Sequence, residues 1–291
     1  MENSNNNNDI NNYNKIFKTE LTQGEFNKLG QFIMSEYGIK MPPEKKIMLQ
    51  SRLQKRLKAL AIDNFKDYLD YLFSPHGMSE EVIHMMDVVS TNKTDFFRES
   101  THFDFMLSEA LPRLTKDLSV KNVKIWSAGC SSGEEPYTLA ITLSEFKEAN
   151  NQIDFSIFAS DISTLVLKTA INAIYNEERI KEIPLVLKKK YFLRSKNHEE
   201  KKVRIIAHLR NKVEFARINL LELTPVREAK YHIVFCRNVL IYFDRATQLK
   251  ILTSLCSNIV KGGYLFLGHS ESITGLDLPV APVVPTVFIK N

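Results

Sequence analysis

The residues best suited to chemistry lie in one stretch, Lys124-Ile-Trp-Ser-Ala-Gly-Cys-Ser-Ser-Gly-Glu-Glu-Pro-Tyr137. Residues 123–128 have the length and the β-branched and aromatic content of a buried parallel strand. Gly129 and Gly133 follow, and they mark a turn at which the backbone comes close to a ligand or to another segment. Residues 138–146 then repeat apolar side chains at helical spacing, so the N-terminus of a helix faces the turn. This order of strand, glycine turn and helix indicates a nucleotide-cofactor site.

The spacing of the glycines narrows the choice of ligand. A dinucleotide site normally shows G-x-G-x-x-G, whereas only two glycines stand here, with residues 130–132 between them. Glu134 and Glu135 occupy the helix start, where they would repel a polyanion and favour a ligand that carries positive charge. S-adenosylmethionine, with its amino group and sulfonium, meets that description. The alternative is an ordinary strand-turn-helix with helix-stabilising glutamates, and the loop alone does not decide between the two.

Two later strands end in polar residues that could complete such a site. The run Phe155-Ser-Ile-Phe-Ala-Ser-Asp161 ends in a carboxylate, which we expect to accept hydrogen bonds from ribose hydroxyls. The alternative role for Asp161 is a helix N-cap. The run from Tyr231 to Asp244 is a buried strand that emerges into a polar and aromatic loop, and another strand ends near Asn219. Open α/β sheets bind ligands at the carboxyl ends of their strands, so these loops are expected at one site.

Composition bounds the class of protein. The chain has 291 residues, of which 44% are hydrophobic and 25% charged, as in a soluble globular protein of about two domains. The net charge of +5 is too small to indicate a nucleic-acid partner by itself. The three cysteines show no C-x-x-C spacing, so we expect no disulfide framework, no metal site and a reducing cytoplasm. No apolar run is long enough for a membrane helix, and we expect no membrane insertion.

The pattern of apolar residues divides the chain into parts. Residues 1–14 are rich in asparagine and poor in apolar residues, which predicts a disordered tail. Residues 15–89 predict a small all-α domain with helices near 24–37, 44–60, 64–73 and 79–88. Residues 90–291 predict an α/β domain, interrupted at about 175–213 by a small antiparallel insertion. The last β-rich run, at 283–289, suits an antiparallel edge strand.

The second predicted helix carries a charged surface beside its apolar stripe. Leu49, Leu53, Leu57 and Leu60 fall on one stripe. Basic side chains run alongside it, and we call Lys45, Arg52, Lys55 and Arg56 the basic ridge. The basic ridge could bind an acidic helical partner or an anionic surface. The alternative is a solvated helix face, which is the more common fate of a charge run.

The segment between the two predicted domains reads Ser90-Thr-Asn-Lys-Thr-Asp-Phe-Phe-Arg-Glu99. Its Asn92, Thr94 and Arg98 could face a ligand pocket. The alternative is a capped helix start in which Asp95 or Thr94 caps and the phenylalanines pack.

Taken together, six ungapped motifs resemble the CheR family of chemotaxis receptor methyltransferases. They are Thr91-Asn-Lys-Thr-Asp-Phe-Phe-Arg-Glu99, Trp126-Ser-Ala-Gly-Cys-Ser-Ser-Gly-Glu-Glu-Pro-Tyr137, Phe158-Ala-Ser-Asp-Ile162, Asn219-Leu-Leu-Glu222, Phe235-Cys-Arg-Asn-Val-Leu-Ile-Tyr-Phe-Asp244 and Gly268-His-Ser-Glu271. The resemblance implies a Rossmann-like α/β methyltransferase domain with a small all-α N-terminal domain and a β-insertion. It also implies methyl transfer from S-adenosylmethionine to glutamates on the cytoplasmic helices of chemoreceptors, with S-adenosylhomocysteine as product, by a cytoplasmic protein expected to be monomeric.

The resemblance also assigns roles to individual residues. Those assigned to the cofactor are Asn92, Thr94, Arg98, Glu135, Asp161, Asn219, Leu220, Arg237 and Asn238. Arg98 and Tyr242 are assigned to catalysis, and the basic ridge to receptor binding. Two rival functions stay open, namely a regulatory module that binds the cofactor without chemistry and a carboxyl methyltransferase for another acidic protein.

One feature departs from the family pattern. Some members bind a tethering peptide through a glycine-containing turn of the insertion, but the corresponding turn here, Arg194-Ser-Lys-Asn-His-Glu-Glu200, has no glycine. We therefore expect peptide tethering to be weak or absent.

Overall fold

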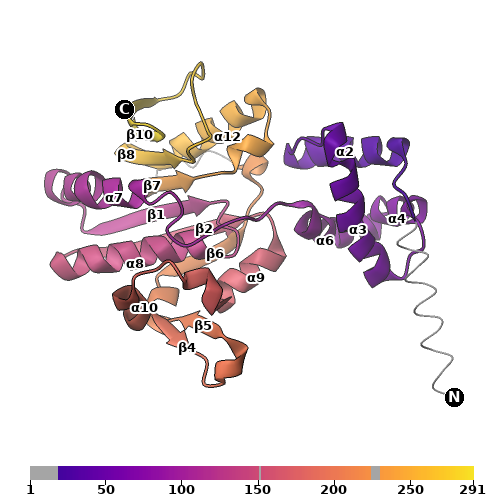
Figure 1. Cartoon of the computed structure of the whole chain (residues 1–291). Coiled ribbons are helices and arrows are strands. Elements are labelled where there is room, and N and C mark those ends of the chain that lie inside the picture. The colour runs from indigo at the N-terminus through magenta and orange to yellow at the C-terminus, as the bar shows by residue number, and fades with distance from the viewer. Residues whose placement is uncertain (1–18, 151, 224–229) are drawn as a thin grey trace. The chain divides into compact units, whose positions relative to one another are not determined.

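A computed structural model describes residues 19–150, 152–223 and 230–291 of the chain, which divides into two compact units at the junction between Thr91 and Asn92 (Figure 1). The predicted tail at 1–14 lies outside the described residues. No helix in the described part of the chain is long and apolar enough to cross a membrane.

The N-terminal unit is all-α, as predicted. Its helices are α2 (Gln23–Tyr37), η1 (Pro43–Lys45), α3 (Lys46–Leu60), α4 (Phe65–Leu72), α5 (Pro75–Ser79) and α6 (Glu81–Val89). Local sequence sets several of their ends. Thr22 and Glu25 form a capping box at the start of α2, and Gly38 ends that helix with a left-handed backbone. The residues predicted as a turn at Ser74–Gly77 instead begin the short helix α5, because Ser74 accepts a hydrogen bond from the Gly77 N–H and caps it.

The apolar stripe of α3 forms part of the core of this unit. Leu49, Leu53 and Leu57 are fully buried. They pack with Phe26, Tyr68 and other buried side chains of α2, α4 and α6 in one hydrophobic cluster. The helical spacing read from the sequence is therefore confirmed for this face of α3.

The C-terminal unit is built on a sheet of seven strands in the order β6-β2-β1-β7-β8-β10-β9. These strands are β1 (Asn122–Ala128), β2 (Asp154–Asp161), β6 (Val213–Arg217), β7 (Tyr231–Cys236), β8 (Ile259–Leu267), β9 (Val280–Val284) and β10 (Val287–Lys290). Strands β6, β2, β1, β7 and β8 pair in parallel, and β10 pairs antiparallel with both β8 and β9. The predicted Rossmann-like α/β fold is confirmed.

Strand order reverses between β1 and β7, because the chain builds outward from β1 to β2 and β6 and then returns to β7 on the other side. In open parallel sheets, such a switch point leaves a crevice at the carboxyl ends of the two central strands, and ligands bind there. The loops after Ala128 and Cys236 leave the sheet at this point. The sequence predicted a site at both loops.

Helices flank the sheet and connect its strands. They are α7 (Thr101–Phe105), which continues through η2 (Met106–Ala110) and η3 (Arg113–Asp117), α8 (Glu134–Ala149), α9 (Thr164–Asn172), η6 (Leu220–Glu222), η7 (Leu240–Tyr242) and α12 (Arg245–Ser257). Ser163 caps α9 and Asp244 caps α12. Most of α8 is buried, since it packs on the strands beneath it.

The insertion forms a small antiparallel sheet of its own in the order β3-β5-β4, as predicted, beside α10 (Figure 1). Its elements are β3 (Ile174–Asn176), η4 (Glu177–Ile180), α10 (Leu185–Tyr191), β4 (Phe192–Arg194), η5 (His198–Glu200), β5 (Lys202–Ile205) and α11 (Ala207–Arg210). The sequence missed β3.

The last β-rich run, at residues 283–289, is antiparallel at the edge of the sheet as predicted, but it is not one strand. The chain instead forms a hairpin in which β9 turns at Pro285 and Thr286 into β10. Of these two strands, β9 lies at the edge of the sheet and β10 pairs on both sides. Residues 283–289 are apolar on both sides of Pro285 and Thr286, so composition alone did not reveal the reversal.

Candidate active site

The glycine turn after β1 and the carboxylate at the end of β2 are joined directly. Asp161 accepts hydrogen bonds from the backbone N–H of Ser131 at 2.8 Å and of Ser163 at 3.0 Å. Its side chain therefore fixes the cofactor turn and also supports the start of α9. The N-cap of α9 is Ser163, so the N-cap alternative for Asp161 is wrong. The ribose role of Asp161 stays a prediction.

Gly129 is required where the loops after β1 and β7 come together. Its φ is +82°, and a Cβ atom there would lie 2.4 Å from a methyl carbon of Val239. Any side chain would push the two loops apart. The close approach inferred from this glycine is thus an approach of one loop to the other.

Arg237 is the central charge of the site. Its side chain is 2% exposed and forms ion pairs with Glu99 at 2.9 Å and Glu135 at 3.1 Å. Ser127 also donates to Glu135, at 2.7 Å. The guanidinium lies over the ring of Phe103 at 5.5 Å. One buried arginine therefore binds together the segment before α7, the start of α8 and the end of β7.

Burial and the charge of Arg237 shift the pKa values of its two carboxylate partners in opposite directions. Burial raises the pKa of Glu135, and the Arg237 charge opposes that shift. Burial also acts to raise the pKa of Glu99, but the hydrogen bond and charge of Arg237 outweigh it, so the pKa of Glu99 lies below its usual value. Burial, followed by the charge of Arg237, lowers the pKa of the neighbouring His102 to about 4. Glu99 is therefore an ionised partner of Arg237.

Glu134 is also paired, by an arginine that the sequence did not single out. The Glu134 side chain is 1% exposed and forms an ion pair with Arg179 of η4. Arg179 also donates to the carbonyl oxygen of Thr94 and to the carboxylate of Asp95. Both acids at the start of α8 are thus balanced by arginines of the same unit. The sequence argument treated Glu134 and Glu135 as unpaired charges that attract a cationic ligand, and this part of it is wrong.

A second buried carboxylate shapes the loop after β7. Glu271 accepts hydrogen bonds at 2.6–3.0 Å from four backbone N–H groups, those of Gly268, Asn238, Val239 and Leu240. Burial raises the pKa of Glu271, and these donors oppose the shift. The sequence quoted this residue within a motif but gave it no role. The four bonds hold the loop that leads into η7 and its terminal Tyr242, which is half-buried.

Several non-glycine residues with a left-handed backbone gather in these loops. Among the described residues with positive φ, those at the site are Phe97, Glu99, Ser131 and Asn238, at +54°, +56°, +49° and +59°. Such conformations cost free energy and persist where surrounding contacts enforce them, typically at functional sites. The Arg237 and Glu271 contacts are the ones that enforce this backbone at Glu99 and Asn238.

The segment around residue 92 meets the glycine turn through its backbone. The hydroxyl of Ser131 donates to the carbonyl oxygen of Asn92 at 2.9 Å. Thr94 is buried and its carbonyl oxygen accepts from Arg179. Arg98 is half-buried, and its guanidinium donates to the carbonyl oxygen of Lys93 at 3.0 Å. The structure thus brings this segment to the predicted cofactor turn.

Asn219 and Leu220 follow β6, beside the end of β2. The Asn219 side chain accepts from the N–H of Leu221 at 3.1 Å and donates to Glu222 at 2.9 Å, which starts the short helix η6. Leu220 is buried. The backbone N–H of Ile218 donates to the carbonyl oxygen of Asp161 at 3.0 Å, so this strand end lies next to the cofactor turn.

Two arginines of the basic ridge are bonded within the N-terminal unit, and the predicted receptor binding by the basic ridge stays a prediction. Arg56 forms a bidentate pair with the buried carboxylate of Glu81, at 2.8 and 2.6 Å. Arg52 donates to the carbonyl oxygens of Val89 and Ser90 at the end of α6. Both arginines therefore hold α3 to α6 inside the N-terminal unit. Lys45 is half-buried, and burial and the charge of Arg52 lower its pKa.

Lys55 is the exposed member of the basic ridge. It lies one helical turn beyond Ser51 and two beyond Ile47, whose side chain is 80% exposed. We call Ile47, Ser51 and Lys55 the outer face of α3. The outer face of α3, which includes Lys55 of the basic ridge, presents an exposed apolar side chain in line with a lysine to a partner.

The insertion turn is closed by its own side chains. The Asn197 N–H donates to the Ser195 hydroxyl, and the Glu199 N–H donates to the Asn197 side chain, both at 3.2 Å. Such local bonds let a turn form without glycine.

The groups gathered at the switch point fit S-adenosylmethionine. Asp161 and Glu135 offer acceptor oxygens for hydroxyl and amino groups, and Asn238 offers an amide at the loop after β7. The turn between β1 and α8 is held within reach of the ends of β2 and β7.

A family model described as CheR methyltransferase, SAM binding domain, matches residues 92–285. A second, described as CheR methyltransferase, all-alpha domain, matches residues 24–90.

Curated relatives match nearly the whole chain. A chemotaxis protein methyltransferase of Borreliella burgdorferi is 39% identical over 276 residues, which cover 93% of this chain and 95% of the relative. Chemotaxis protein methyltransferases of Salmonella typhimurium and Escherichia coli are 37% and 36% identical over 88% of this chain, and these matches cover 86% and 87% of those proteins. A solved magnesium protoporphyrin IX methyltransferase of Synechocystis with bound SAM matches at 18% identity over 68% of this chain and 72% of its own, with a TM-score of 0.32, too low to add to the argument.

Proposed function

Because this chain belongs to the CheR family of S-adenosylmethionine-dependent methyltransferases, we propose that it esterifies glutamate side chains on the cytoplasmic helices of chemoreceptors. The observation that carries the proposal is the joined set of loops at the switch point, where Arg237 and Glu271 order the β7 loop against the cofactor turn. A receptor substrate of this kind would place the enzyme in the cytoplasm.

Methyl transfer to a glutamate carboxylate requires no proton transfer by the protein. A glutamate carboxylate is ionised near neutral pH, so it attacks without a general base. S-adenosylmethionine supplies an activated methyl group. The contribution of this chain is alignment and exclusion of water, and alignment of two reactants can supply several kcal/mol of the barrier.

Arg98 and Tyr242 are the proposed partners of the reacting groups. A guanidinium has five N–H donors, so the bond of Arg98 to the Lys93 carbonyl leaves capacity to hold a substrate carboxylate from the side. A strong pair with the attacking oxygen would lower its nucleophilicity. Tyr242 ends the helical turn that the Glu271-bound loop leads into, so its position depends on that loop.

Label transfer tests the proposal against its rivals. The chain is incubated with methyl-labelled cofactor and either a receptor cytoplasmic fragment, an unrelated acidic protein or no substrate. We expect label on the receptor fragment alone, released by base as expected for a carboxyl ester. Cofactor binding without transfer to any substrate would support the regulatory module, and equal transfer to the unrelated protein would support a general carboxyl methyltransferase.

The outer face of α3 is the proposed receptor contact. We expect Lys55→Glu to lower kcat/KM for the receptor fragment by up to about 5-fold at low salt, since exposed charge pairs are each worth about 0.2–1 kcal/mol. Added salt should reduce the difference between variant and parent. Methylation rates at two ionic strengths measure it.

The matched control is Lys66→Glu on α4, which makes the same charge change at a side chain that is 77% exposed. Calorimetric binding of S-adenosylhomocysteine should be the same for both variants. Equal rates for Lys55→Glu and the parent protein would remove the outer face of α3 from the docking surface. Reversal of Arg52 or Arg56 is a poor test, because each is bonded within its own unit.

A further inference from the structure

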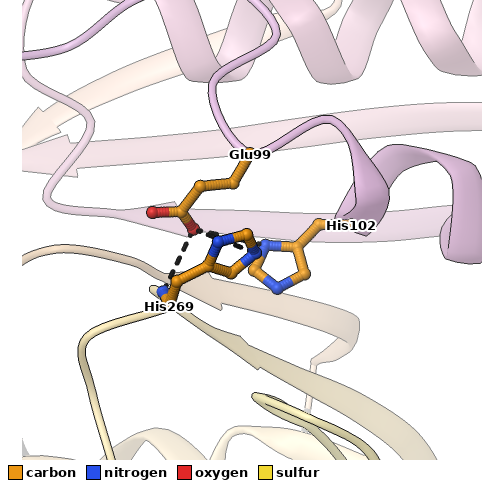
Figure 2. A group of neighbouring side chains, drawn as sticks. All are labelled: Glu99, His102 and His269. Carbon is orange, nitrogen blue, oxygen red and sulfur yellow. Dashed lines mark hydrogen bonds and ion pairs between the residues drawn. The ribbon is translucent and has the colours of Figure 1, made fainter.

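Three side chains beside the Arg237 network converge on one point. Glu99 precedes α7, His102 lies in α7, and His269 follows β8 (Figure 2). His102 Nδ1 lies 3.7 Å, and His269 Nε2 3.9 Å, from Glu99 Oε2. The three atoms all lie within 4.8 Å of one another. At 3.7 Å and 3.9 Å these two pairs are too long for hydrogen bonds. The backbone N–H of His269 donates to Glu99 Oε2 at 3.2 Å, and His269 Nε2 lies 3.4 Å from the Thr101 hydroxyl.

The tautomer of His102 follows from its other nitrogen. The hydroxyl of Thr286 donates its proton to the carbonyl oxygen of Pro285 at 2.7 Å. The same hydroxyl lies 2.8 Å from His102 Nε2, and it must accept there because its only proton is already used. His102 therefore carries its proton on Nε2, and in the neutral ring Nδ1 presents a lone pair toward the Glu99 carboxylate.

The lone pair of His102 Nδ1 is buried and accepts no hydrogen bond from a described residue. The His102 side chain is 3% exposed, and Nδ1 is one of the buried polar atoms without a hydrogen-bond partner among the described residues. A lone pair aimed at a carboxylate costs free energy unless a cation lies between them. Two imidazoles and a carboxylate are the ligand set of open zinc sites, with a further position for water.

The hairpin at Thr286 supports the same reading. Thr286 has a φ of +62°, a strained value for a β-branched residue, and this conformation places its hydroxyl on His102. A hydroxyl or carbonyl that accepts the second N–H of a ligating histidine is the usual outer partner in metal sites, because it fixes the tautomer.

We propose that Glu99 Oε2, His102 Nδ1 and His269 Nε2 form a binding site for a divalent transition-metal ion of the zinc class. Ligands of a tetrahedral zinc ion lie about 3.3 Å apart for bonds of about 2.0–2.1 Å, so the three atoms have to draw together. His269 can make most of this movement, since its side chain is 53% exposed. Its exposed side leaves room for water as a further ligand.

Arg237 limits the affinity of the site. Its guanidinium lies 2.9 Å from the same oxygen of Glu99, and the two positive charges repel. The ion is therefore bound more weakly than it would be without this neighbouring cation, and it links α7 to the loop after β8. The three cysteines of the chain are buried and do not compete for it.

Titration of the full-length, untagged chain with Zn²⁺ and with Co²⁺ tests the site, by calorimetry and by the visible absorption of bound Co²⁺. We expect one ion per chain. His269→Gln should weaken binding at least about tenfold, and Thr286→Val about 10- to 100-fold, whereas Thr286→Ser should bind as the parent does. His208→Gln, at an exposed histidine of α11, is the control and should change nothing.

Three results would overturn the proposal. The first is the absence of one-to-one binding at micromolar Zn²⁺. The second is unchanged affinity in His269→Gln. The third is an equal loss in His208→Gln, which would identify scattered surface histidines as the ligands. Because His269 and Thr286 contact no proposed cofactor group, calorimetry with S-adenosylhomocysteine separates failure of this site from failure of the proposed function.

Discussion

Replacing Arg237 by methionine is expected to destabilise the C-terminal unit by about 3–5 kcal/mol, because removing one partner of a buried ion pair leaves an uncompensated charge. Here two carboxylates, Glu99 and Glu135, lose their shared partner. Urea unfolding measures the loss. Trp126 is the only tryptophan of the chain and lies buried in β1, so its fluorescence reports this unit alone.

Arg113→Met is the matched control for the Arg237 variant. Arg113 is half-buried and lies over the ring of Tyr264. Its hydrogen-bond acceptors are neutral, namely the carbonyl oxygen of Gly262 and the hydroxyl of Tyr264. Its loss should cost about 0.5–1.5 kcal/mol. Adding Glu99→Gln and Glu135→Gln to Arg237→Met should recover part of the stability, since it removes the unpaired charges. A loss below about 1 kcal/mol in Arg237→Met would contradict the role assigned to this network.

Asp161→Ala is expected to weaken binding of S-adenosylhomocysteine by about 1–3 kcal/mol, or roughly 5- to 150-fold, as for loss of hydrogen bonds to a charged group. The variant removes a proposed acceptor for the ribose hydroxyls. It also frees the backbone N–H groups of Ser131 and Ser163, so we expect a loss of unfolding free energy as well. Calorimetry gives the affinity, and Trp126 fluorescence gives the stability.

Ser163→Ala separates these two effects of the Asp161 variant. It removes the N-cap of α9 and should cost about 1 kcal/mol of stability, but it leaves the Asp161 carboxylate in place. Cofactor affinity should then stay close to that of the parent protein. If Asp161→Ala lost no more affinity than Ser163→Ala, Asp161 would serve only as a clamp on the turn.

The positions of the cofactor loops could be predicted from sequence because each follows directly from a strand. A buried apolar run that ends in Gly129 or Asp161 places that residue at the carboxyl edge of the sheet, and the edge is where open sheets bind ligands. The local signal was enough, since strand length and turn chemistry are properties of neighbouring residues.

The ion pairs at the site could not be predicted in the same way. Arg237 and Glu135 are separated by 102 residues, and nothing in the local sequence says which acid a given arginine meets. The charge argument at Glu134 and Glu135 failed for this reason, because it counted two acids and missed their arginines. Glu271 could have been found as an acid in a glycine-containing loop directly after a buried strand.

The basic ridge shows a similar limit. The helical period predicted correctly which side of α3 is buried. It did not predict that Arg52 and Arg56, at the border of that side, reach α6. Long basic side chains can turn toward the protein as readily as toward solvent, and the choice depends on acceptors elsewhere in the unit.

A crystal structure with S-adenosylhomocysteine tests the central claim, that this chain binds its cofactor where β1 and β7 end and aims it at a substrate carboxylate. The account predicts the adenosyl group between the turn at residues 129–133 and the Asn219–Leu220 backbone, with a ribose hydroxyl on Asp161 and the sulfur near Asn238 and Tyr242. Product bound at another edge of the sheet, or with its sulfur turned away from Tyr242, would contradict the account.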